Sequence, residues 1–318
     1  MSSAREIADG RLEPSRVVSA SFGQASLWFL RQVMPYPSAY NTAVQFRISG
    51  RLDAGALTAA IREVVRRHES LRTTFRSADG AVVQVISESL LADVATIDLS
   101  GSPDPEAAGA RLGLDLAAAP FDLEQGPLLR ARLLRFGPTD HALVAVVDHI
   151  VADGMSLAIL WRELEALYGA FQAGEPSPLP PPSRQFADCV DAQRGWLTTP
   201  AFTKQLRYWT SHLAGATAPE LPADRPRPAI RSYRGGLATK NVPASLVTRL
   251  REACVQDDVS LFAAMLAGLD VVLARSCGER DVVVMVPMAG RQRLGGDGVV
   301  GYFANLALLR TEVPGDLS

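Results

Sequence analysis

The segment ALVAVVDHIVADGMSLAIL, residues 142–160, passes from an apolar run through a short polar turn into an amphipathic pattern. The apolar run predicts a buried strand, and the pattern after Gly154 predicts a helix. A buried strand that ends in Asp148 and His149 places both side chains at a sheet edge or cleft, where a histidine can act as a general base near neutral pH. Alone, this pattern more often marks a packed histidine and, at Asp153, a helix-capping turn.

The elements around this segment predict an α/β chain with two lobes. Strands are expected at 128–136 and 141–147, and a long helix follows to about residue 172. A further strand is expected at 237–242. The segment GEPSPLPPPS, residues 174–183, holds five prolines and can be neither helix nor central strand. We therefore expect helices packed on mixed sheets, with a leader at 1–20, an N-terminal lobe at 21–173, a proline-rich linker at 174–183 and a C-terminal lobe at 184–318.

The composition is that of a globular chain. Its 318 residues are 47% hydrophobic and 21% charged, which is enough for one or two buried cores. The net charge of −2 argues against nucleic acid as a main partner. Three scattered cysteines fit neither a disulfide framework nor a zinc site. The apolar runs are too short to cross a membrane and no signal-peptide core is evident, so we expect no membrane partner and a reducing, cytoplasmic setting.

Five segments match the signatures of one known family in their usual order. They are SFGQASLWFL (21–30), RHESLRTTF (67–75), DHIVADGMS (148–156), a looser match at 185–196, and VVGYFANLALLR (299–310). Together they resemble the condensation domains of nonribosomal peptide synthetases, and the second and last signatures are specific. DHIVADGMS stands where that family has its active-site signature, His-His-x-x-x-Asp-Gly-x-Ser.

The resemblance implies two chloramphenicol-acetyltransferase-like lobes in a V-shaped arrangement, with a tunnel between them. It implies that substrates arrive as thioesters on the phosphopantetheine arms of upstream and downstream carrier proteins, and that the domain itself binds no cofactor or metal. The amine of the acceptor aminoacyl group would attack the donor acyl or peptidyl thioester to form an amide bond, as in antibiotic biosynthesis. Other synthetase domains would be further partners, and the isolated domain would be a monomer.

The resemblance also implies roles for single residues. His149 matches the second histidine of the signature and would hydrogen-bond or deprotonate the attacking amine, or support the tetrahedral intermediate. Gly154 would let a pantetheine-borne substrate approach the backbone, and its amide could donate to an oxyanion. Asp153 would pair structurally with an arginine of the second lobe, for which Arg291 is our candidate. Three residues of the second signature would belong to the first-lobe scaffold: Arg67, His68 and Arg72.

Asp148 departs from the family, because the first histidine of the signature usually stands at this position. If the position only supports the turn, condensation activity should survive. Alternatively, Asp148, Asp153 and Ser156 fit the Asp-x-x-x-x-Asp-x-x-Ser signature of heterocyclisation domains, in which Asp148 and Ser156 would be candidate catalytic residues. We favour condensation, because His149 and the first two signatures look like the standard condensation type.

The C-terminal part of the sequence also departs from the family. Family members usually continue well past the signature at 299–310, so we expect the second lobe to be incomplete, with an open sheet edge and exposed apolar surface. Such a chain would be less stable than a complete domain. Asp148 and the short C-terminal part favour a rival function, a catalytically inactive condensation-like module that recruits other proteins. A free-standing acyltransferase that uses a soluble thioester is a further rival.

Overall fold

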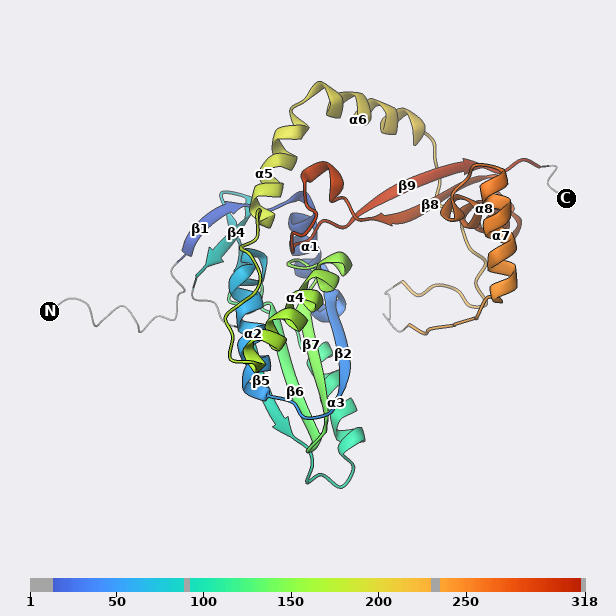
Figure 1. The fold of residues 1–318 in the computed structure, drawn as a ribbon. Helices are drawn as coiled ribbons and strands as arrows, with labels where there is room; N and C mark the ends of the chain where they lie inside the picture. The colour runs from blue at the N-terminus through green and yellow to red at the C-terminus, as the bar shows by residue number, and fades with distance from the viewer. Residues whose placement is uncertain (1–13, 89–91, 230–234, 316–318) are drawn as a thin grey trace. The chain divides into compact units, whose positions relative to one another are not determined.

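The computed structural model describes residues 14–88, 92–229 and 235–315, which form two compact units (Figure 1). The first unit runs to Thr199 and also takes in Ala289–Asn305, and the second comprises Pro200–Met288 and the chain from Leu306 onward. These boundaries differ from the expected lobes at 21–173 and 184–318. The reason is packing, because Phe186 and Val190 share a buried apolar cluster with Val299 and Phe303. Helix α5 (Phe186–Leu197) and the segment 289–305 therefore belong to the first unit.

A four-stranded mixed sheet forms the centre of the first unit. Its order is β2 (Asn41–Ser49), β7 (Asp140–Asp148), β6 (Leu129–Gly137) and β5 (Asp93–Asp98). β7 pairs antiparallel with both neighbours, whereas β5 and β6 run parallel. The register places Asn41 opposite Asp148, so that the first residue of β2 lies beside the last residue of β7. The strands expected at 128–136 and 141–147 are thus β6 and β7.

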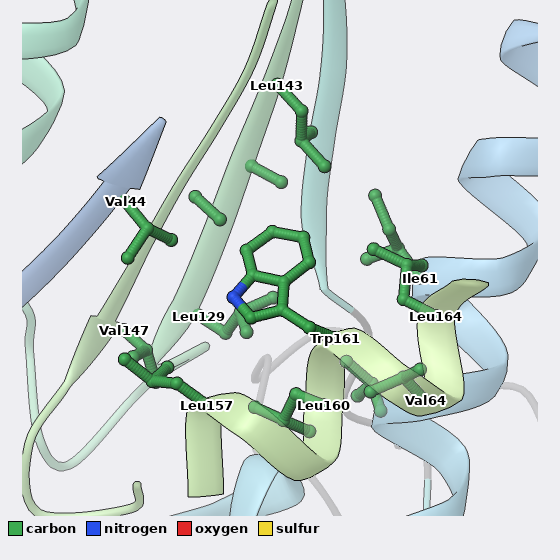
Figure 2. A pocket seen from close by; sticks show the side chains of 13 residues that line it. Val44, Ile61, Val64, Leu129, Leu143, Val147, Leu157, Leu160, Trp161 and Leu164 are labelled. Atoms are coloured by element: carbon green, nitrogen blue, oxygen red, sulfur yellow. The ribbon is translucent and has the colours of Figure 1, made fainter. Parts of the chain in front are cut away.

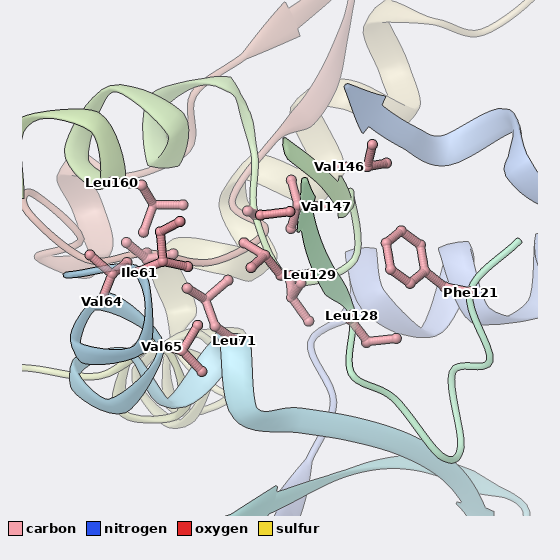
Figure 3. Packing of buried hydrophobic residues seen from close by; sticks show 14 of the residues in the cluster. Ile61, Val64, Val65, Leu71, Phe121, Leu128, Leu129, Val146, Val147 and Leu160 are labelled. Atoms are coloured by element: carbon pink, nitrogen blue, oxygen red, sulfur yellow. The ribbon is translucent and has the colours of Figure 1, made fainter. Parts of the chain in front are cut away.

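Helices cover both faces of this sheet, which explains why β7 is apolar along nearly its whole length. Val147 of β7 packs in the large core cluster with Ile61 of α2 (Ala54–Arg67) and Leu160 of α4 (Gly154–Gln172) (Figure 3). Ala142 and Val144 point the other way and pack toward α3 (Pro105–Ala118). The remaining helical elements of the first unit are α1 (Phe22–Val33), α5 (Phe186–Leu197) and three 3₁₀ turns, at Pro37–Tyr40, Glu69–Arg72 and Gln292–Leu294.

The structure also has a separate three-stranded sheet. Its first strand lies within residues 1–20, where we expected an unstructured leader, so that expectation is wrong for residues 14–19. The order of this sheet is β1 (Pro14–Ser19), β4 (Ala81–Ser87) and β3 (Thr73–Ala78). β1 pairs antiparallel with β4, and Val17 lies opposite Val85. The β-branched pair Val17 and Val18 suits a strand, whereas the polar residues around it suggested a loose segment. Residues 1–13 of the expected leader lie outside the described residues.

The second unit contains α6 (Pro200–His212), α7 (Ala244–Gln256), α8 (Leu261–Cys277), β8 (Asp281–Met288) and β9 (Asn305–Glu312). β8 and β9 pair with each other in a two-stranded sheet, and Arg310 joins them by a bidentate ion pair with Asp281, at 2.8 and 2.7 Å. A strand expected at 237–242 is wrong, since the backbone there is irregular. Apolar side chains of α8 such as Phe262, Met265 and Val272 are more than half exposed.

Among the described residues, no single helix is long and apolar enough to cross a bilayer. Only α7 and α8 taken together would reach that length and composition, across a bend of 106°.

An apolar cavity of about 60 Å³ lies in the first unit between the four-stranded sheet and helices α2 and α4 (Figure 2). Its walls include Val44 and Val147 from the sheet, Ile61 from α2, and Leu157 and Trp161 from α4. None of the lining residues is titratable. The cavity therefore offers no acid or base. The turn between β7 and α4 does, because it carries Asp148, His149 and Asp153.

Candidate active site

The turn between β7 and α4 is built by local hydrogen bonds. Asp153 is the N-cap of α4, and its Oδ1 accepts a hydrogen bond from the backbone N–H of Ser156 at 2.8 Å. At the other end, the backbone N–H of Asp148 donates to Leu128 of the neighbouring chain segment at 3.0 Å, and Val151 N–H closes the turn onto Asp148 at 3.1 Å. The turn therefore connects two fixed ends, one on a central strand and one on a capped helix.

His149 lies half-buried at the outer part of this turn. Its backbone N–H donates to the carbonyl of Tyr40 at 2.9 Å. Its ring Nδ1 lies 2.9 Å from the carbonyl oxygen of Ala152. Because a carbonyl oxygen can only accept, Nδ1 carries the proton, and in the neutral ring Nε2 has the free lone pair. The arrangement gives His149 one basic nitrogen and a fixed tautomer.

The ring of Tyr302 holds the His149 ring from one side. The two rings meet edge to face with centroids 5.1 Å apart. Burial raises the pKa of the Tyr302 hydroxyl, so Tyr302 is neutral at physiological pH. The residue lies within a signature segment, but the sequence carried no sign that it touches the histidine.

The ion pair expected between Asp153 and Arg291 is present. Arg291 Nη2 lies 2.5 Å from Asp153 Oδ1, and the two side chains are 5% and 4% exposed. The other carboxylate oxygen accepts a hydrogen bond from the backbone N–H of Phe303 at 3.1 Å. Arg291 Nη1 in turn donates to the carbonyls of Gly296 and Val299, at 3.1 and 2.5 Å. Asp153 therefore anchors the loop 289–305, which belongs to the same unit as the turn, whereas we expected the arginine to come from the second lobe.

Ser156 is completely buried in this same network. Its Oγ accepts hydrogen bonds from Arg291 Nη2 at 2.8 Å and from the backbone N–H of Gly301 at 3.0 Å. It also lies 2.8 Å from Asp153 Oδ1 and 2.9 Å from the carbonyl oxygen of Gly301. With its donor and acceptor positions used inside the protein, Ser156 joins helix α4 to the loop 289–305.

Asp148 is buried as well, with 1% of its surface exposed. Its Oδ2 lies 2.8 Å from Nη2 of Arg31, a residue of α1, and its Oδ1 accepts a hydrogen bond from the backbone N–H of Ile150 at 3.0 Å. Burial raises the pKa of the Asp148 carboxyl, against the opposing effects of the hydrogen bond from Ile150 and of the Arg31 cation. Sequence analysis did not identify Arg31, because α1 and the turn are more than 100 residues apart.

Gly154 is exposed and begins α4. A Cβ added at this position would meet no other atom within 4 Å. Packing inside the protein therefore does not require glycine here. As the first helical residue, Gly154 has an N–H that no carbonyl of the same helix can accept, so it is free to donate to a ligand.

Arg67 and Arg72 lie in the scaffold, in contacts that do not involve the turn. Arg67 forms two hydrogen bonds with the Glu163 carboxylate, at 2.8 and 3.3 Å, and His68 Nε2 donates to the same carboxylate at 2.9 Å. Arg72 donates to the backbone carbonyls of Val65, at 3.2 Å, and Ser87, at 2.5 Å. These contacts join α2 to α4 and to the three-stranded sheet.

Comparison with known proteins gives one consistent result. The family model described as Condensation domain matches residues 15–317. The chain is 41% identical over 302 residues to chondramide synthase cmdD of Chondromyces crocatus, covering 94% of this chain and 8% of that protein. It is 38% identical over 304 residues to phosphinothricin tripeptide synthetase PhsC of Streptomyces viridochromogenes, covering 95% of this chain and 28% of that protein. The chain thus spans a small part of the length of these relatives.

Solved structures agree with the sequence matches. The X-domain from teicoplanin biosynthesis superposes with a TM-score of 0.84 at 30% identity, covering 96% of this chain and 68% of that one. The first condensation domain of the CDA synthetase superposes with a TM-score of 0.73 at 25% identity, covering 96% of this chain and 72% of that one.

Proposed function

This chain belongs to the condensation-domain family of nonribosomal peptide synthetases, and we propose that it joins a carrier-bound donor acyl or peptidyl thioester to the amine of a carrier-bound acceptor by an amide bond. The observation that carries this proposal is the state of His149. Its Nδ1–H is held by the carbonyl of Ala152, which leaves a basic Nε2 on a half-buried ring. Such a nitrogen can accept a proton from an attacking amine.

The reaction moves one proton in two steps, from the acceptor amine to His149 and from His149 to the leaving thiolate. The acceptor nitrogen adds to the donor carbonyl carbon while its proton moves to His149 Nε2. The tetrahedral oxyanion then collapses, the C–S bond breaks, and the proton returns to the departing phosphopantetheine thiolate. The exposed N–H of Gly154 is placed at a helix start, where it suits an oxyanion. Because a thioester is already activated, alignment of the two arms supplies much of the rate.

The intact mass of the acceptor carrier tests this proposal. The protein is incubated with an upstream carrier loaded with donor and a downstream carrier loaded with an amino acid. A gain equal to the donor acyl group supports condensation. An additional arm with a soluble acyl thioester in place of the upstream carrier tests the free-standing acyltransferase. Absence of any gain with several donor–acceptor pairs contradicts both.

Two variants of His149 distinguish the role of Nε2 as a base from the role of the Nδ1 hydrogen bond to Ala152. His149→Ala removes the ring, whereas His149→Asn keeps an N–H that can reach the Ala152 carbonyl but has no basic nitrogen. We expect both to lose about 10²- to 10⁴-fold in turnover, as for loss of a general base. If His149→Asn retains most of the activity, the histidine serves only to position the turn.

The heterocyclisation alternative has less support from the geometry. It requires Asp148 or Ser156 to reach substrate, yet these residues are 1% and 0% exposed. Asp148 lies in an ion pair with Arg31, and Ser156 accepts a hydrogen bond from Arg291. The same mass assay distinguishes this reaction, because a Cys, Ser or Thr acceptor would then gain the acyl mass less one water.

A recruitment module is the second candidate function. One matching structure is a complex of the X-domain and OxyB from teicoplanin biosynthesis, on which this chain superposes with a TM-score of 0.83 at 30% identity. A recruiter should bind its carrier or enzyme partner equally well after the His149→Ala substitution and show no acyl transfer. We propose that either activity is carried out in the cytoplasm by a monomeric domain with other synthetase domains as partners.

A further inference from the structure

Helix α1 contributes a buried cation to the turn that carries His149. Arg31 Nη2 lies 2.8 Å from Asp148 Oδ2, and the two side chains are only 5% and 2% exposed. The same guanidinium nitrogen donates to the carbonyl of Phe121 at 3.2 Å, which fixes the arginine at a second point. A buried pair of this kind costs desolvation energy, and removal of one partner leaves an uncompensated charge.

The Asp148 carboxylate bridges α1 and the residue that follows His149. One oxygen contacts Arg31, and the other accepts a hydrogen bond from the backbone N–H of Ile150 at 3.0 Å. His149 therefore lies in the chain between Asp148, which carries the carboxylate, and Ile150, whose backbone N–H the carboxylate binds. A shift of the carboxylate would move the backbone on which the histidine ring is carried.

A second side chain of α1 contacts the same turn. Gln24 is completely buried, and its Nε2 donates to the carbonyl of Ile150 at 3.2 Å. Its Oε1 accepts a hydrogen bond from the backbone N–H of Ser21 at 2.9 Å, which completes the capping box of α1. Gln24 and Arg31 are seven residues apart, or two helical turns, and so lie on one face of the helix. One helix face thus contacts both neighbours of His149.

Burial and the groups around Asp148 act on its carboxyl in opposite directions. Burial disfavours the ionised carboxylate and raises the pKa of Asp148. The hydrogen bond from the Ile150 N–H opposes that effect, as do the positive charges of Arg31, His149 and Arg130. Of these three, Arg31 forms the direct ion pair. Where the family signature has a histidine, this chain has an acid that is paired with a buried cation.

We infer that Arg31 is a positioning residue: it holds the Asp148 carboxylate in its bridging position and thereby holds His149 with Nδ1 protonated and Nε2 free. Its effect on turnover rests on the proposed condensation activity, whereas its effect on the His149 ring does not.

Histidine side-chain NMR and acyl-transfer kinetics test this inference together. The protein is labelled with ¹⁵N-histidine, and the signals of His149 are assigned by comparison with His149→Ala. The variants are Arg31→Met, the double variant Arg31→Met with Asp148→Asn, and Gln32→Met as a control at an exposed neighbouring position of α1. The double variant removes the anion together with the cation, and asparagine keeps an oxygen that can accept from Ile150.

We expect Arg31→Met to change the His149 tautomer signals and to lower kcat about 10- to 100-fold with little change in KM for the acceptor carrier. The double variant should recover the His149 signals and most of kcat, and Gln32→Met should match the parent protein. If the parent shows no turnover, but Arg31→Met changes its His149 signals and the double variant restores them, the condensation proposal fails while the positioning role of Arg31 is supported.

Three results would overturn the inference. One is an unchanged His149 spectrum in folded Arg31→Met. Another is a change that the double variant does not reverse, since the effect would then not come from the unpaired charge. The third result applies if Arg31→Met does not fold and Arg31→Lys, which retains the cation, is used in its place. A folded Arg31→Lys that has lost the His149 signals counts against the inference, and one that keeps them supports it.

Discussion

Replacement of Glu163 by glutamine tests the scaffold under the active site, because this carboxylate receives Arg67 and His68 together. Burial opposes ionisation of Glu163, but the hydrogen bonds from His68 and Arg67 outweigh it and lower the pKa of the carboxyl to about 2. Against the ordinary value of 4.5 this is a difference of about 2.5 units, or about 3 kcal/mol of stability at about 1.36 kcal/mol per unit. Residual solvent screening at the partly exposed carboxylate reduces the expected value to about 2 kcal/mol.

The sign of the pH dependence follows from the lowered pKa. The stabilisation is fully present above the unfolded-state pKa of 4.5 and is lost as the pH falls toward 2. With these two values, about a quarter of the stabilisation has gone by pH 4 and more than half by pH 3. We therefore expect Glu163→Gln to destabilise the protein by about 2 kcal/mol at pH 7 and by clearly less at pH 3.

Urea-induced unfolding followed by tryptophan fluorescence, at pH values from 7 to 3, measures this difference. Glu165→Gln is the matched control, since Glu165 is exposed on the same helix and should change stability by less than about 0.5 kcal/mol. A Glu163→Gln penalty that stays constant from pH 7 to pH 3, or equals that of Glu165→Gln, would refute the argument.

Two other predictions concern packing and thiol reactivity. A Cβ added at Gly301 overlaps the ring of Phe186, so Gly301→Ala should cost about 1–3 kcal/mol of stability, whereas Gly154→Ala should leave the thermal midpoint nearly unchanged because its Cβ meets open space. Thermal unfolding of both variants checks this, and equal midpoints would contradict it. Cys189 is buried, and burial raises the pKa of its thiol. It should therefore react with an aromatic disulfide reagent at least about tenfold more slowly than the half-exposed Cys277. Mass spectrometry of the labelled peptides measures the two rates.

The candidate site was predictable in part because its signal is local. An apolar strand, a polar turn and an amphipathic helix follow one another within 19 residues, and Asp153 caps the helix through the N–H of Ser156, three positions later. Such short-range patterns depend on periodicity and capping, which the chain shows directly. The Asp153–Arg291 pair joins residues 138 positions apart, and only its motif resemblance made it predictable.

The errors of sequence interpretation share a physical cause. Residues 14–19 form a strand because β4 offers a free edge, and residues 237–242 form none because among the described residues no neighbouring strand pairs with them. Strand formation depends on a partner that can lie far along the chain. The assignment of 289–305 to the first unit likewise depends on how Val299 and Phe303 pack with Phe186.

The sequence by itself determined the α/β class, the strand–turn–helix that carries His149, and the family to which the chain is similar, because these depend on periodicity, capping and short motifs. The tertiary structure alone decided which nitrogen of His149 is free, that Asp148 is paired with Arg31, and that Ser156 is buried in a hydrogen-bond network with Arg291. These features arise from contacts between segments that only folding brings together. Burial then sets the protonation and orientation of each group, and no local pattern in the chain encodes it.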